Sequence, residues 1–581
     1  MPRKLLNWNN IIYFICGLAA GIAALSLSLL FKISFNSLFV PEIASQALVS
    51  LSSGEIESRA VETLGPLAKY STFFGAIFVN VLLYGLIGLL IGTIFNKINL
   101  KQFIKRALFS SFVSYIILLV VSLSFIILNT VPGQKLSFPV LSLSMLIIPH
   151  LLFGFIYSFC FERIRNRKSS RYDVGQNQDK IANDISKESQ SNLTSKPSIM
   201  KNVGEDIDYR KRALLRALVV SAIALPIMYF GLNRLFSHSE QTPQQQQQLS
   251  GSPSLASQSL QSRSKSRPPG FENAILTPLI DSEVTPTYLF YRIDKNAIVP
   301  VIDDENWSLS IKGLVNNPLN LNYNDIKSMN SVEQYATLSC VSNKIGGDLV
   351  STALWKGVHL RDILTKAQIK QGAKYIVFRC YDGYDVGIPI ESGLMEGTIL
   401  AYEMNNVPLP NEHGYPLRAI VPGFYGMMNP KWITEIELVD STYEGFWQRK
   451  GWTNNGNNNI YSTIVTAGNQ EITHRFPNLV QDNFAIGKPS RIAGIAFAGD
   501  RGISKIEVST DGGKTWKTAI VKDPLSKYTW VLWTSGFIPK VKGDYKIVVR
   551  ATDKTGNIQT SNFAEPFPNG SSGYNMVGVN V

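Results

Sequence analysis

Five apolar runs in the first 232 residues constrain the fold of this chain more than any other feature. They cover residues 11–31, 72–95, 107–128, 140–161 and 213–232. A helix needs about 20 apolar residues to cross the hydrocarbon core of a bilayer, and each run is long enough. Because lipid offers no partners to backbone N–H and C=O groups, these runs are predicted to be transmembrane helices. The first run is too long, and lacks a suitable cleavage site, for a removed signal peptide.

Basic residues flank the apolar runs unequally. Arg3 and Lys4 precede the first run, and basic clusters fall within 97–106 and 163–212, whereas the stretch 50–62 leans acidic. Because loops rich in Lys and Arg stay in the cytoplasm, we predict a multi-pass protein of the cell membrane with a cytoplasmic N-terminus. Everything after the fifth run is then extracytoplasmic. The net charge of +13 is attributed to this topology and to contact with membrane lipid, and no nucleic-acid binding is expected.

Composition divides the chain into four segments. Residues 1–236 are predicted to form an all-α membrane domain with about five transmembrane helices, and residues 237–271, rich in Ser and Gln, a disordered linker. Residues 272–445 mix strand-like and helical runs, which predicts an α+β domain. Residues 446–581 contain strand after strand, which predicts an all-β sandwich of immunoglobulin type. The expected strands cover residues 307–311, 374–379, 417–421, 432–439, 492–497, 503–509, 529–533, 545–551 and 576–581, and the expected helices cover 360–367 and 390–393.

The chain contains four cysteines, of which Cys340 and Cys380 lie outside the apolar runs. Two cysteines in an extracytoplasmic domain can form a disulfide, which is one interpretation. Cys340 also ends the strand-like run 335–339 and precedes a loop that contains Gly346 and Gly347. A thiol at the end of a strand beside such a loop is well placed to supply a thiolate ligand to a metal cofactor, which is the other interpretation.

Charged and glycine-rich segments downstream of Cys340 suit a buried cofactor that carries a phosphate group. Such a cofactor requires cationic donors and the backbone N–H groups of open loops. Arg418 and Lys431 supply cations, and the loop 423–426 supplies open backbone. His413 is one of only five His and stands in a His-Gly-Tyr-Pro-Leu-Arg string before a Val-Pro-Gly turn. A lone His is more often an ordinary core or surface residue, but this context favours a site.

Taken together, these residues resemble the sulfite oxidase family of molybdenum-cofactor enzymes. The resemblance runs from about residue 276 to residue 581, and so many ordered matches are more specific than any single motif. It rests on segments 288–292, 337–340 with Asn343, 355–358, 400–405, 409–414, 422–432 and 447–449. The C-terminal sandwich is similar to the dimerisation domain of that family, which implies a homodimer.

The resemblance implies a role for each matching residue. Cys340 is the one protein ligand to the metal, so it must be a thiolate rather than half of a disulfide. Cys340, Arg292 and Trp452 form the catalytic set. The chemistry implied is oxygen-atom transfer coupled to two electrons, with the protein supplying binding and orientation. The residues do not distinguish molybdenum from tungsten. The residues implied to hold the molybdopterin cofactor are Tyr291, Arg292, Asn343, Asp382, His413, Arg418, Asn429, Pro430 and Lys431.

The chain also departs from the family pattern around the substrate. Trp452 stands where animal and plant sulfite oxidases have a pocket tyrosine, and Lys344 and Ile345 stand where an arginine follows the metal cysteine. The segment 568–570 lacks another expected arginine. Sulfite is a compact dianion that needs several fixed cations, so a pocket with fewer arginines and an added indole suits a different substrate. The expected substrate is therefore a small oxyanion or a sulfoxide-type compound.

Two further expectations concern partners. The chain has no Cys-x-x-Cys-His or His-Pro-Gly string for a haem, so no haem is expected and electrons must pass to or from a separate protein. The leading hypothesis is a membrane-tethered extracytoplasmic molybdopterin oxidoreductase. Its alternatives are a sulfoxide-type reductase on the same scaffold and a cofactor-free surface or adhesion protein.

Overall fold

A computed structural model describes residues 8–35, 37–64, 67–98, 100, 102–128, 144–160, 201–237, 283–467, 470–471 and 484–581. The predicted linker, apart from residue 237, lies outside the described residues. The chain forms two compact units. The first comprises Met1–Leu51 and Lys69–His238, and the second comprises Ser52–Ala68 and Ser239–Val581.

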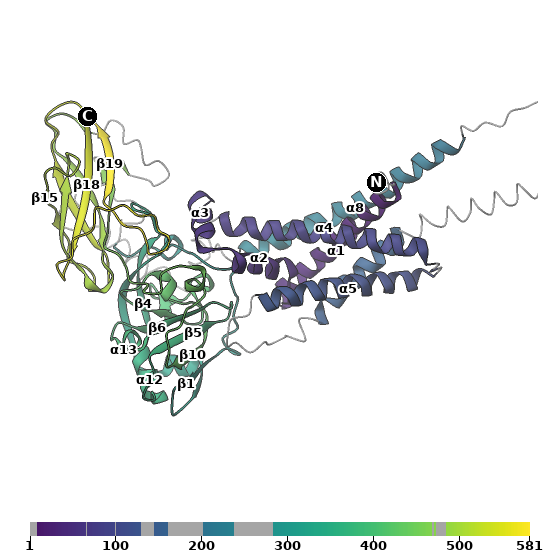
Figure 1. Ribbon diagram of the computed structural model, residues 1–581, viewed down its shortest axis with the longest axis horizontal. Helices are drawn as coiled ribbons and strands as arrows, with labels where there is room; N and C mark the ends of the chain where they lie inside the picture. Colours follow the sequence, from purple (N-terminus) through teal and green to yellow (C-terminus); the bar gives the residue numbers. More distant parts are fainter. Residues whose placement is uncertain are drawn as a thin grey trace, which may run out of the picture. The chain divides into compact units, whose positions relative to one another are not determined.

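The first unit is built from long apolar helices that run side by side (Figure 1). Four helical segments are long and apolar enough to cross a membrane, namely Trp8–Phe35, Tyr70–Phe95, Phe103–Leu128 and Ala217–Leu235. They match four of the five predicted runs. The remaining run corresponds to a shorter apolar helix, Ile147–Cys160, because residues 140–143 lie outside the described part. The helices of this unit are α1 (Trp8–Phe35), α2 (Val40–Leu51), α4 (Leu67–Lys97), α5 (Phe103–Leu128) and α8 (Lys201–Ser237).

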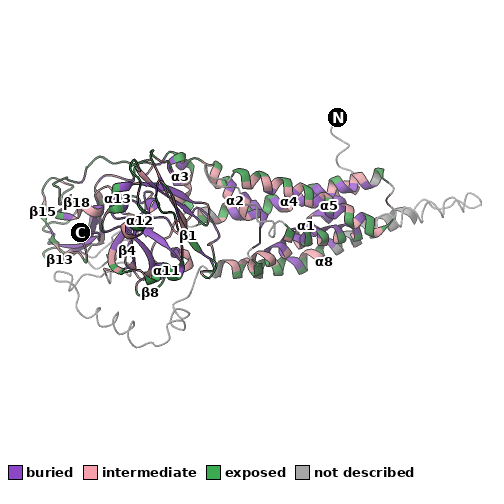
Figure 2. Cartoon of the chain, turned by 90° about the horizontal axis from the view of Figure 1, so that it is seen from below, coloured by how far each residue is buried: buried purple, intermediate pink, exposed green. Residues whose placement is uncertain are grey.

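The outward face of α4 explains why this unit suits a bilayer. Phe74, Phe78, Leu82, Leu86 and Leu90 recur every fourth residue, and each is more than a third exposed. Residues four apart lie on one face of a helix, so they form a continuous apolar stripe. Figure 2 shows exposed residues along α4 and α8. A stripe of this length would be costly in water and is expected for a helix that contacts lipid.

The second unit begins with the short helix α3 (Gly54–Leu64) and continues as an α+β domain with two mixed or antiparallel sheets. One sheet has the strand order β2-β1-β10-β5-β6, in which only the β1–β10 pair is parallel. The other has the order β3-β4-β7-β8, with β9 paired to β7. The strands are β1 (Ser308–Gly313), β2 (Leu319–Asn322), β3 (Ser331–Ser339), β4 (Val350–His359), β5 (Tyr375–Cys380), β6 (Asp385–Pro389), β7 (Ile399–Met404), β8 (Val407–Pro408), β9 (Arg418–Ile420) and β10 (Ile433–Val439).

Short helices cover and connect these sheets. They are α11 (Tyr323–Ser328), α12 (Leu360–Ala367), α13 (Ile390–Leu394) and the 3-10 turns η1 (Thr287–Leu289), η2 (Asn411–His413), η3 (Gly426–Met428) and η4 (Gln448–Lys450). The predicted helix 360–367 coincides with α12, because its apolar residues Leu360, Ile363, Leu364 and Ala367 follow the helical period and are all buried.

Trp355 on β4 is the centre of the core beneath the β3–β4 sheet. Its side chain is fully buried among Phe290, Leu338 and Met404, and its indole N–H donates to the carbonyl of Ala336 at 3.2 Å. The antiparallel register pairs Ala336 with Ala353 and runs to the end of β3 at Ser339. This pair of small residues lies two positions along the strands from Trp355, which itself pairs with Gln334.

The C-terminal domain is a sandwich of two antiparallel sheets, as predicted. The sheets have the orders β12-β11-β13-β17-β16 and β15-β14-β18-β19. Their shared core contains Trp533, Ile506, Val549 and Val577. The strands are β11 (Tyr461–Ala467), β12 (Gln470–Glu471), β13 (Ser490–Phe497), β14 (Ile503–Ser509), β15 (Lys517–Thr518), β16 (Ile520–Val521), β17 (Val531–Phe537), β18 (Asp544–Asp553) and β19 (Asn575–Asn580), with the turn η5 (Gly499–Arg501) between β13 and β14.

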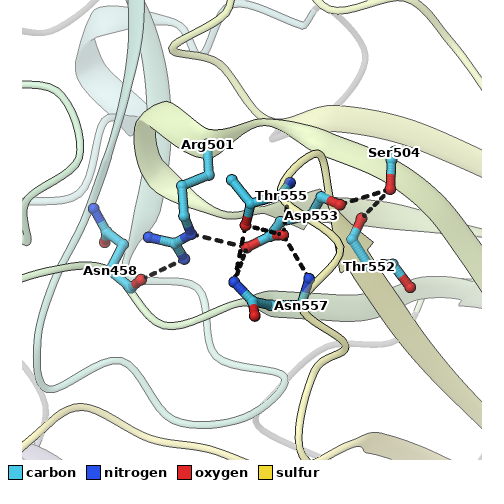
Figure 3. A network of polar contacts seen from close by, with 7 residues as sticks. All are labelled: Asn458, Arg501, Ser504, Thr552, Asp553, Thr555 and Asn557. Atoms are coloured by element: carbon cyan, nitrogen blue, oxygen red, sulfur yellow. Dashed lines mark hydrogen bonds and ion pairs between the residues drawn. The ribbon is translucent and has the colours of Figure 1, made fainter.

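A buried carboxylate at the end of β18 fixes the loops of the sandwich (Figure 3). Asp553 accepts hydrogen bonds from Arg501 Nε at 2.9 Å, from the backbone N–H and hydroxyl of Thr555 at 3.0 and 2.7 Å, and from the backbone N–H of Asn557 at 2.9 Å. Burial raises the pKa of Asp553, but these hydrogen bonds together lower it by more, so the carboxyl has a pKa below its ordinary value. Arg501 also donates to the carbonyl of Asn458 at 2.9 Å, which ties the sandwich to the segment that precedes β11.

We expect Asp553→Ala to lower the free energy of unfolding of the sandwich by about 3–5 kcal/mol, because it leaves the Arg501 guanidinium and two backbone N–H groups without their acceptor. The measurement is a urea titration of the full chain in detergent, followed by hydrogen exchange of peptides from β14 and β18. Asp544→Ala is the matched control, since Asp544 is exposed on the same strand, and we expect a change of about 0.5 kcal/mol or less.

The contribution of Asp553 to the free energy of unfolding depends on pH with a sign that its lowered pKa fixes. A carboxyl with a lowered folded pKa contributes stability above its ordinary pKa, and this stability disappears as the pH falls through the folded value. The difference between wild type and Asp553→Ala should therefore be full at neutral pH and shrink below about pH 4. Equal stability of the two proteins at neutral pH would contradict this account of the loop network.

Candidate active site

A deep cavity opens in the α+β domain where the ends of several elements meet. It encloses about 960 Å³ of empty space, part of which is open to solvent. The cavity brings together the predicted site residues Tyr291, Arg292, Cys340, Asp382, His413, Arg418, Asn429, Pro430, Lys431 and Trp452.

Cys340 follows the last residue of β3 and is a free thiol. Its backbone N–H donates to the carbonyl of Leu349 at 2.9 Å, which fixes the start of the glycine-containing loop. Its Sγ lies 3.0 Å from the hydroxyl of Ser342. Cys380 is also buried and free, so the disulfide interpretation is wrong in this structure. Burial raises the pKa of the Cys340 thiol, although the hydrogen bonds at Ser342 oppose the shift.

Arg418, at the start of β9, carries a buried positive charge into the cavity. Its Nη1 donates to the carbonyl of His413 at 3.0 Å, its Nη2 lies 3.4 Å from the carbonyl of Asn429, and its guanidinium lies 4.8 Å from the ring centroid of Trp355. The Nε–H has no hydrogen-bond partner among the described residues. Burial lowers the pKa of Arg418 to about 10, so the side chain stays charged at neutral pH. A buried guanidinium with an unused N–H is the kind of donor that a phosphate requires.

His413 ends η2 and is held as a neutral ring. Its Nε2 lies 3.1 Å from the carbonyl of Thr287, which can only accept, so Nε2 carries the proton. The ring packs edge-on against Phe290 at 5.5 Å between centroids. Burial, with the charges of Lys431 and Arg418 nearby, lowers the pKa of His413 to about 3. His413 therefore offers an acceptor nitrogen at Nδ1 rather than a positive charge.

Asp294 holds two cations of the cavity in place. It lies 3.1 Å from Arg292 Nε and forms an ion pair with Lys431. Lys431 Nζ also donates to the carbonyl of Glu412 at 3.0 Å and lies 4.4 Å from the ring centroid of Trp432. Burial lowers the pKa of Lys431, and Asp294 opposes that shift. The carboxylate thus keeps two cations at one wall of the cavity.

The turn between β5 and β6 supplies an acidic group opposite a buried amine. Asp382 accepts from the backbone N–H of Tyr384 at 3.0 Å, and burial raises the pKa of its carboxyl. Lys295 has its Nζ 5.0 Å from the ring centroid of Phe446. Burial lowers the pKa of Lys295, and the charges of Asp382 and Asp385 raise it. Lys295 is a cation of the cavity that was not predicted from the sequence.

The loop that ends in Asn429 is shaped by close approach. A Cβ on Gly426 would lie 2.3 Å from the hydroxyl of Tyr291, so only glycine fits there. The Asn429 side chain accepts from the backbone N–H of Val421 at 2.6 Å and donates to the carbonyl of Tyr425 at 3.0 Å. Asn429 therefore sets the shape of the loop, while the backbone of the loop faces the cavity.

Asn343 is the one predicted residue that does not line this cavity. It lies in a smaller adjoining cavity that also touches Cys340. Its Oδ1 accepts from the backbone N–H of Leu349 at 3.0 Å, and its Nδ2 has no partner among the described residues. In the same cavity both side-chain polar atoms of Asn458 lack partners within the described part of the chain. Asn343 is thus placed to shape the Cys340 loop from behind.

Comparison with known proteins decides the family. Residues 296–447 match the oxidoreductase molybdopterin-binding domain, and residues 457–566 match the Mo-co oxidoreductase dimerisation domain. Oxidoreductase YuiH of Bacillus subtilis is 34% identical over 155 residues, which cover 26% of this chain and 76% of that protein. This chain belongs to the sulfite oxidase family. It is a molybdopterin-dependent oxidoreductase, which replaces the hypothesis of a cofactor-free adhesion protein.

Relatives with different activities match the chain about equally well. The sulfite oxidase of Arabidopsis thaliana is 28% identical over 341 residues, covering 49% of this chain and 84% of that protein. The nitrate reductase (NADPH) of Aspergillus niger is also 28% identical, over 354 residues that cover 49% of this chain and 40% of that protein. Identity alone therefore does not select one substrate within the family.

The residues of the cavity fit a molybdopterin cofactor. Arg418 lacks a carboxylate at ion-pair distance among the described residues, so a phosphate would complete its environment. No cluster of three or more His, Cys, Asp or Glu that could hold a metal occurs in the described part. A metal at Cys340 would need most of its ligands from the cofactor, as dithiolene sulfurs provide.

Three charged residues that line the cavity were not predicted: Glu57, Asp294 and Lys295. Asp294 and Lys295 follow the recognised Tyr291-Arg292 pair closely, so their charges were an available signal. Lys450, which pairs with Glu57, follows the recognised Trp-Gln-Arg string directly. Glu57 lies between the first two apolar runs, and no local pattern there indicates a catalytic contact.

We expect Arg418→Lys to reduce the molybdopterin content of the purified chain by about 10- to 150-fold, because a lost hydrogen bond to a charged group costs about 1.5–3 kcal/mol. Lysine keeps the charge but has neither the Nε–H nor the planar face that stacks on Trp355. The measurement is the pterin released on denaturation, per chain. Arg361→Lys on α12 is the control, since Arg361 is partly exposed and does not line the cavity. Wild-type pterin content in Arg418→Lys would contradict the assignment.

Proposed function

We propose that this chain is a membrane-tethered, extracytoplasmic oxidoreductase that transfers an oxygen atom at a molybdenum cofactor bound in the cavity. Arg418 carries this proposal, because a buried guanidinium with an unused N–H and no carboxylate at ion-pair distance among the described residues is stabilised by a bound anion. Electrons are exchanged two at a time with a separate partner, and water supplies or takes up the oxygen atom.

Each residue has a defined part in this proposal. When bound, the cofactor and its metal supply oxygen-atom transfer coupled to two electrons. Cys340 coordinates the metal as a thiolate, since a bound cation displaces the proton of a buried thiol. Arg418 and Lys431 hold the phosphate, and neutral His413 accepts an N–H of the pterin. Arg292 and Trp452 border the substrate.

The proposed substrate is a sulfoxide-type compound, with a small oxyanion such as sulfite as the second candidate. Lys295 adds positive charge to the cavity, which favours an oxyanion. Trp452 is buried and packs edge-on against Phe567 at 5.2 Å, and Trp447 lies at the same side. Two indoles at the substrate side favour a compound with an apolar part.

The orientation is supported by the place of α3. This helix precedes α4 in the chain but belongs to the same compact unit as the cavity. Both must then lie on one side of the membrane, which requires an even number of crossings between them. The apolar helices α4, α5, Ile147–Cys160 and the span in α8 give four. Together with α1 they make the five predicted crossings, and the basic clusters place the N-terminus in the cytoplasm.

A homodimer forms through the sandwich in this proposal, as the matched dimerisation domain supports. Ile558, Phe563 and Met576 of the sandwich expose more than half of their side chains. Exposed large apolar residues of this kind are typical of a surface that is covered in an oligomer.

We expect Cys340→Ser to abolish molybdenum binding and activity while the chain remains folded, because a serine hydroxyl is a poor ligand beside dithiolene sulfurs. Metal analysis should give about one molybdenum per wild-type chain and less than about a tenth of that in the variant. Activity is measured with sulfite and ferricyanide, and with methionine sulfoxide and reduced viologen. Cys380→Ser is the control, since Cys380 is equally buried but does not line the cavity.

The outcomes separate the hypotheses. Turnover of methionine sulfoxide with little turnover of sulfite supports the leading substrate, and the reverse supports the second candidate. Wild-type protein that is folded but free of molybdenum and pterin would contradict the proposed function altogether.

The proposed orientation predicts which side of the membrane each loop faces. A cysteine in place of Arg59, an exposed residue of α3, should react with a membrane-impermeant thiol reagent in intact cells. A cysteine in place of Lys97, exposed at the end of α4, should react only after permeabilisation. Labelling of both positions in intact cells, or of Lys97→Cys alone, would contradict the topology.

A further inference from the structure

One wall of the cavity comes from a helix far away in the chain. Glu57, Ser58 and Val61 of α3 line the cavity, although the other lining residues lie between positions 290 and 452. Ser58 is buried, and the side chain of Glu57 is only 15% exposed. The cavity is therefore incomplete without the segment between the first two apolar helices.

The contact is specific and close. Lys450 Nζ donates to Glu57 Oε1 at 2.7 Å and to the carbonyl of Ser52 at 2.9 Å. A Cβ on Gly54 would lie 2.8 Å from the Lys450 carbonyl, from Trp452 Nε1 and from the ring of Phe567. Only glycine allows this approach, so the first turn of α3 is seated against the residues beside Lys450.

The ion pair changes what the cavity can bind. Lys450 is almost fully buried, with 6% of its side chain exposed, and its Nζ lies 4.9 and 5.9 Å from the ring centroids of Phe446 and Trp447. Lys450 does not itself line the cavity, so its charge acts on the cavity from directly behind Glu57, which does. Its charge is already matched by Glu57, whose second oxygen, Oε2, has no hydrogen-bond partner among the described residues. An entering oxyanion would meet a carboxylate rather than a free cation.

We propose that Glu57 is a specificity-determining residue of the oxidoreductase cavity. Its carboxylate forms an ion pair with Lys450 and repels small oxyanions from this wall of the cavity. The cavity therefore selects an uncharged substrate whose oxygen is bonded to sulfur or nitrogen. This inference rests on the proposed function and narrows its substrate class. The apolar side chains of Val61, Met427 and Trp452 around the ion pair suit the organic part of such a compound.

The test uses two unreactive probes of the same tetrahedral shape, sulfate and dimethyl sulfone, which differ in charge. Binding to the full-length, molybdenum-loaded protein is followed by tryptophan fluorescence, which needs no turnover. Wild type should bind dimethyl sulfone at least 10-fold more tightly than sulfate. Sulfate binding as tight as sulfone binding, or tighter, would overturn the proposal without any variant being made.

Glu57→Gln tests the residue itself, because glutamine keeps the shape and removes the charge. Sulfate should bind this variant at least 10-fold more tightly than wild type, whereas sulfone binding should change less than twofold. Glu55→Gln is the matched control, since Glu55 is exposed on the same helix and pairs with Arg59 at 2.8 Å, and it should behave as wild type. The double variant Glu57→Gln with Lys450→Gln should lose the gain in sulfate affinity, since the gain depends on the freed lysine. Unchanged sulfate affinity in Glu57→Gln with wild-type molybdenum content would overturn the proposal.

The two proposals fail in different ways. Loss of the proposed function appears as wild-type protein without molybdenum or pterin. Loss of this inference appears as fully loaded protein whose preference between sulfate and dimethyl sulfone does not depend on Glu57.

Discussion

The burial of positive charge in one cavity is the constraint on which the rest of the site depends. Arg292, Lys295, Arg418 and Lys431 line it, and Lys450 is buried against Glu57 of its wall. Each of these charges would be costly to remove from water alone. The protein supplies carboxylates for some of them: Asp294 serves Arg292 and Lys431, and Glu57 serves Lys450. Arg418 is left with carbonyl oxygens and the face of Trp355. The distribution of carboxylates thus marks where the protein provides its own anion and where a ligand must provide one.

This distribution depends on the sheets beneath the cavity. Trp355 supports Arg418 from below and takes its position from the β3–β4 pairing, and the same pairing ends β3 one residue before Cys340. Cys340, the proposed metal ligand, and Arg418, the proposed phosphate-binding cation, are therefore both positioned by one pair of strands. His413 remains neutral for a related reason, since burial lowers its pKa and the charges of Lys431 and Arg418 lower it further. The site consists of few charges, each held by a packed element.

Much of this could be predicted from the sequence, and the reasons are local. The helix α12 and the strand β14 have the predicted bounds. The buried residues of α12 follow the helical period, and buried Ile506 and Val508 of β14 alternate with the less buried Lys505 and Glu507. The cavity residues were found through ordered motifs that span both soluble domains. Asn343 was placed in the site by the same motifs, but it lies in the adjoining cavity, since its side chain bonds the Cys340 loop. Glu57 could not be predicted, because its role depends on a contact with Lys450 across almost 400 positions of sequence.

The place of α3 gives the apolar helices a role beyond anchoring. A single helix would suffice to tether a soluble enzyme to a membrane, so additional crossings call for a structural reason. In the proposed topology the first crossing and the one that follows α3 fix both ends of the segment that carries Glu57. The remaining crossings return the chain to the same side, where the cavity forms. A segment held at both ends loses less conformational entropy on docking than a free tail does, which favours a fixed wall over a mobile cover. The membrane domain then contributes to the chemistry of the cavity, because the segment between its helices carries Glu57, the carboxylate that pairs with Lys450.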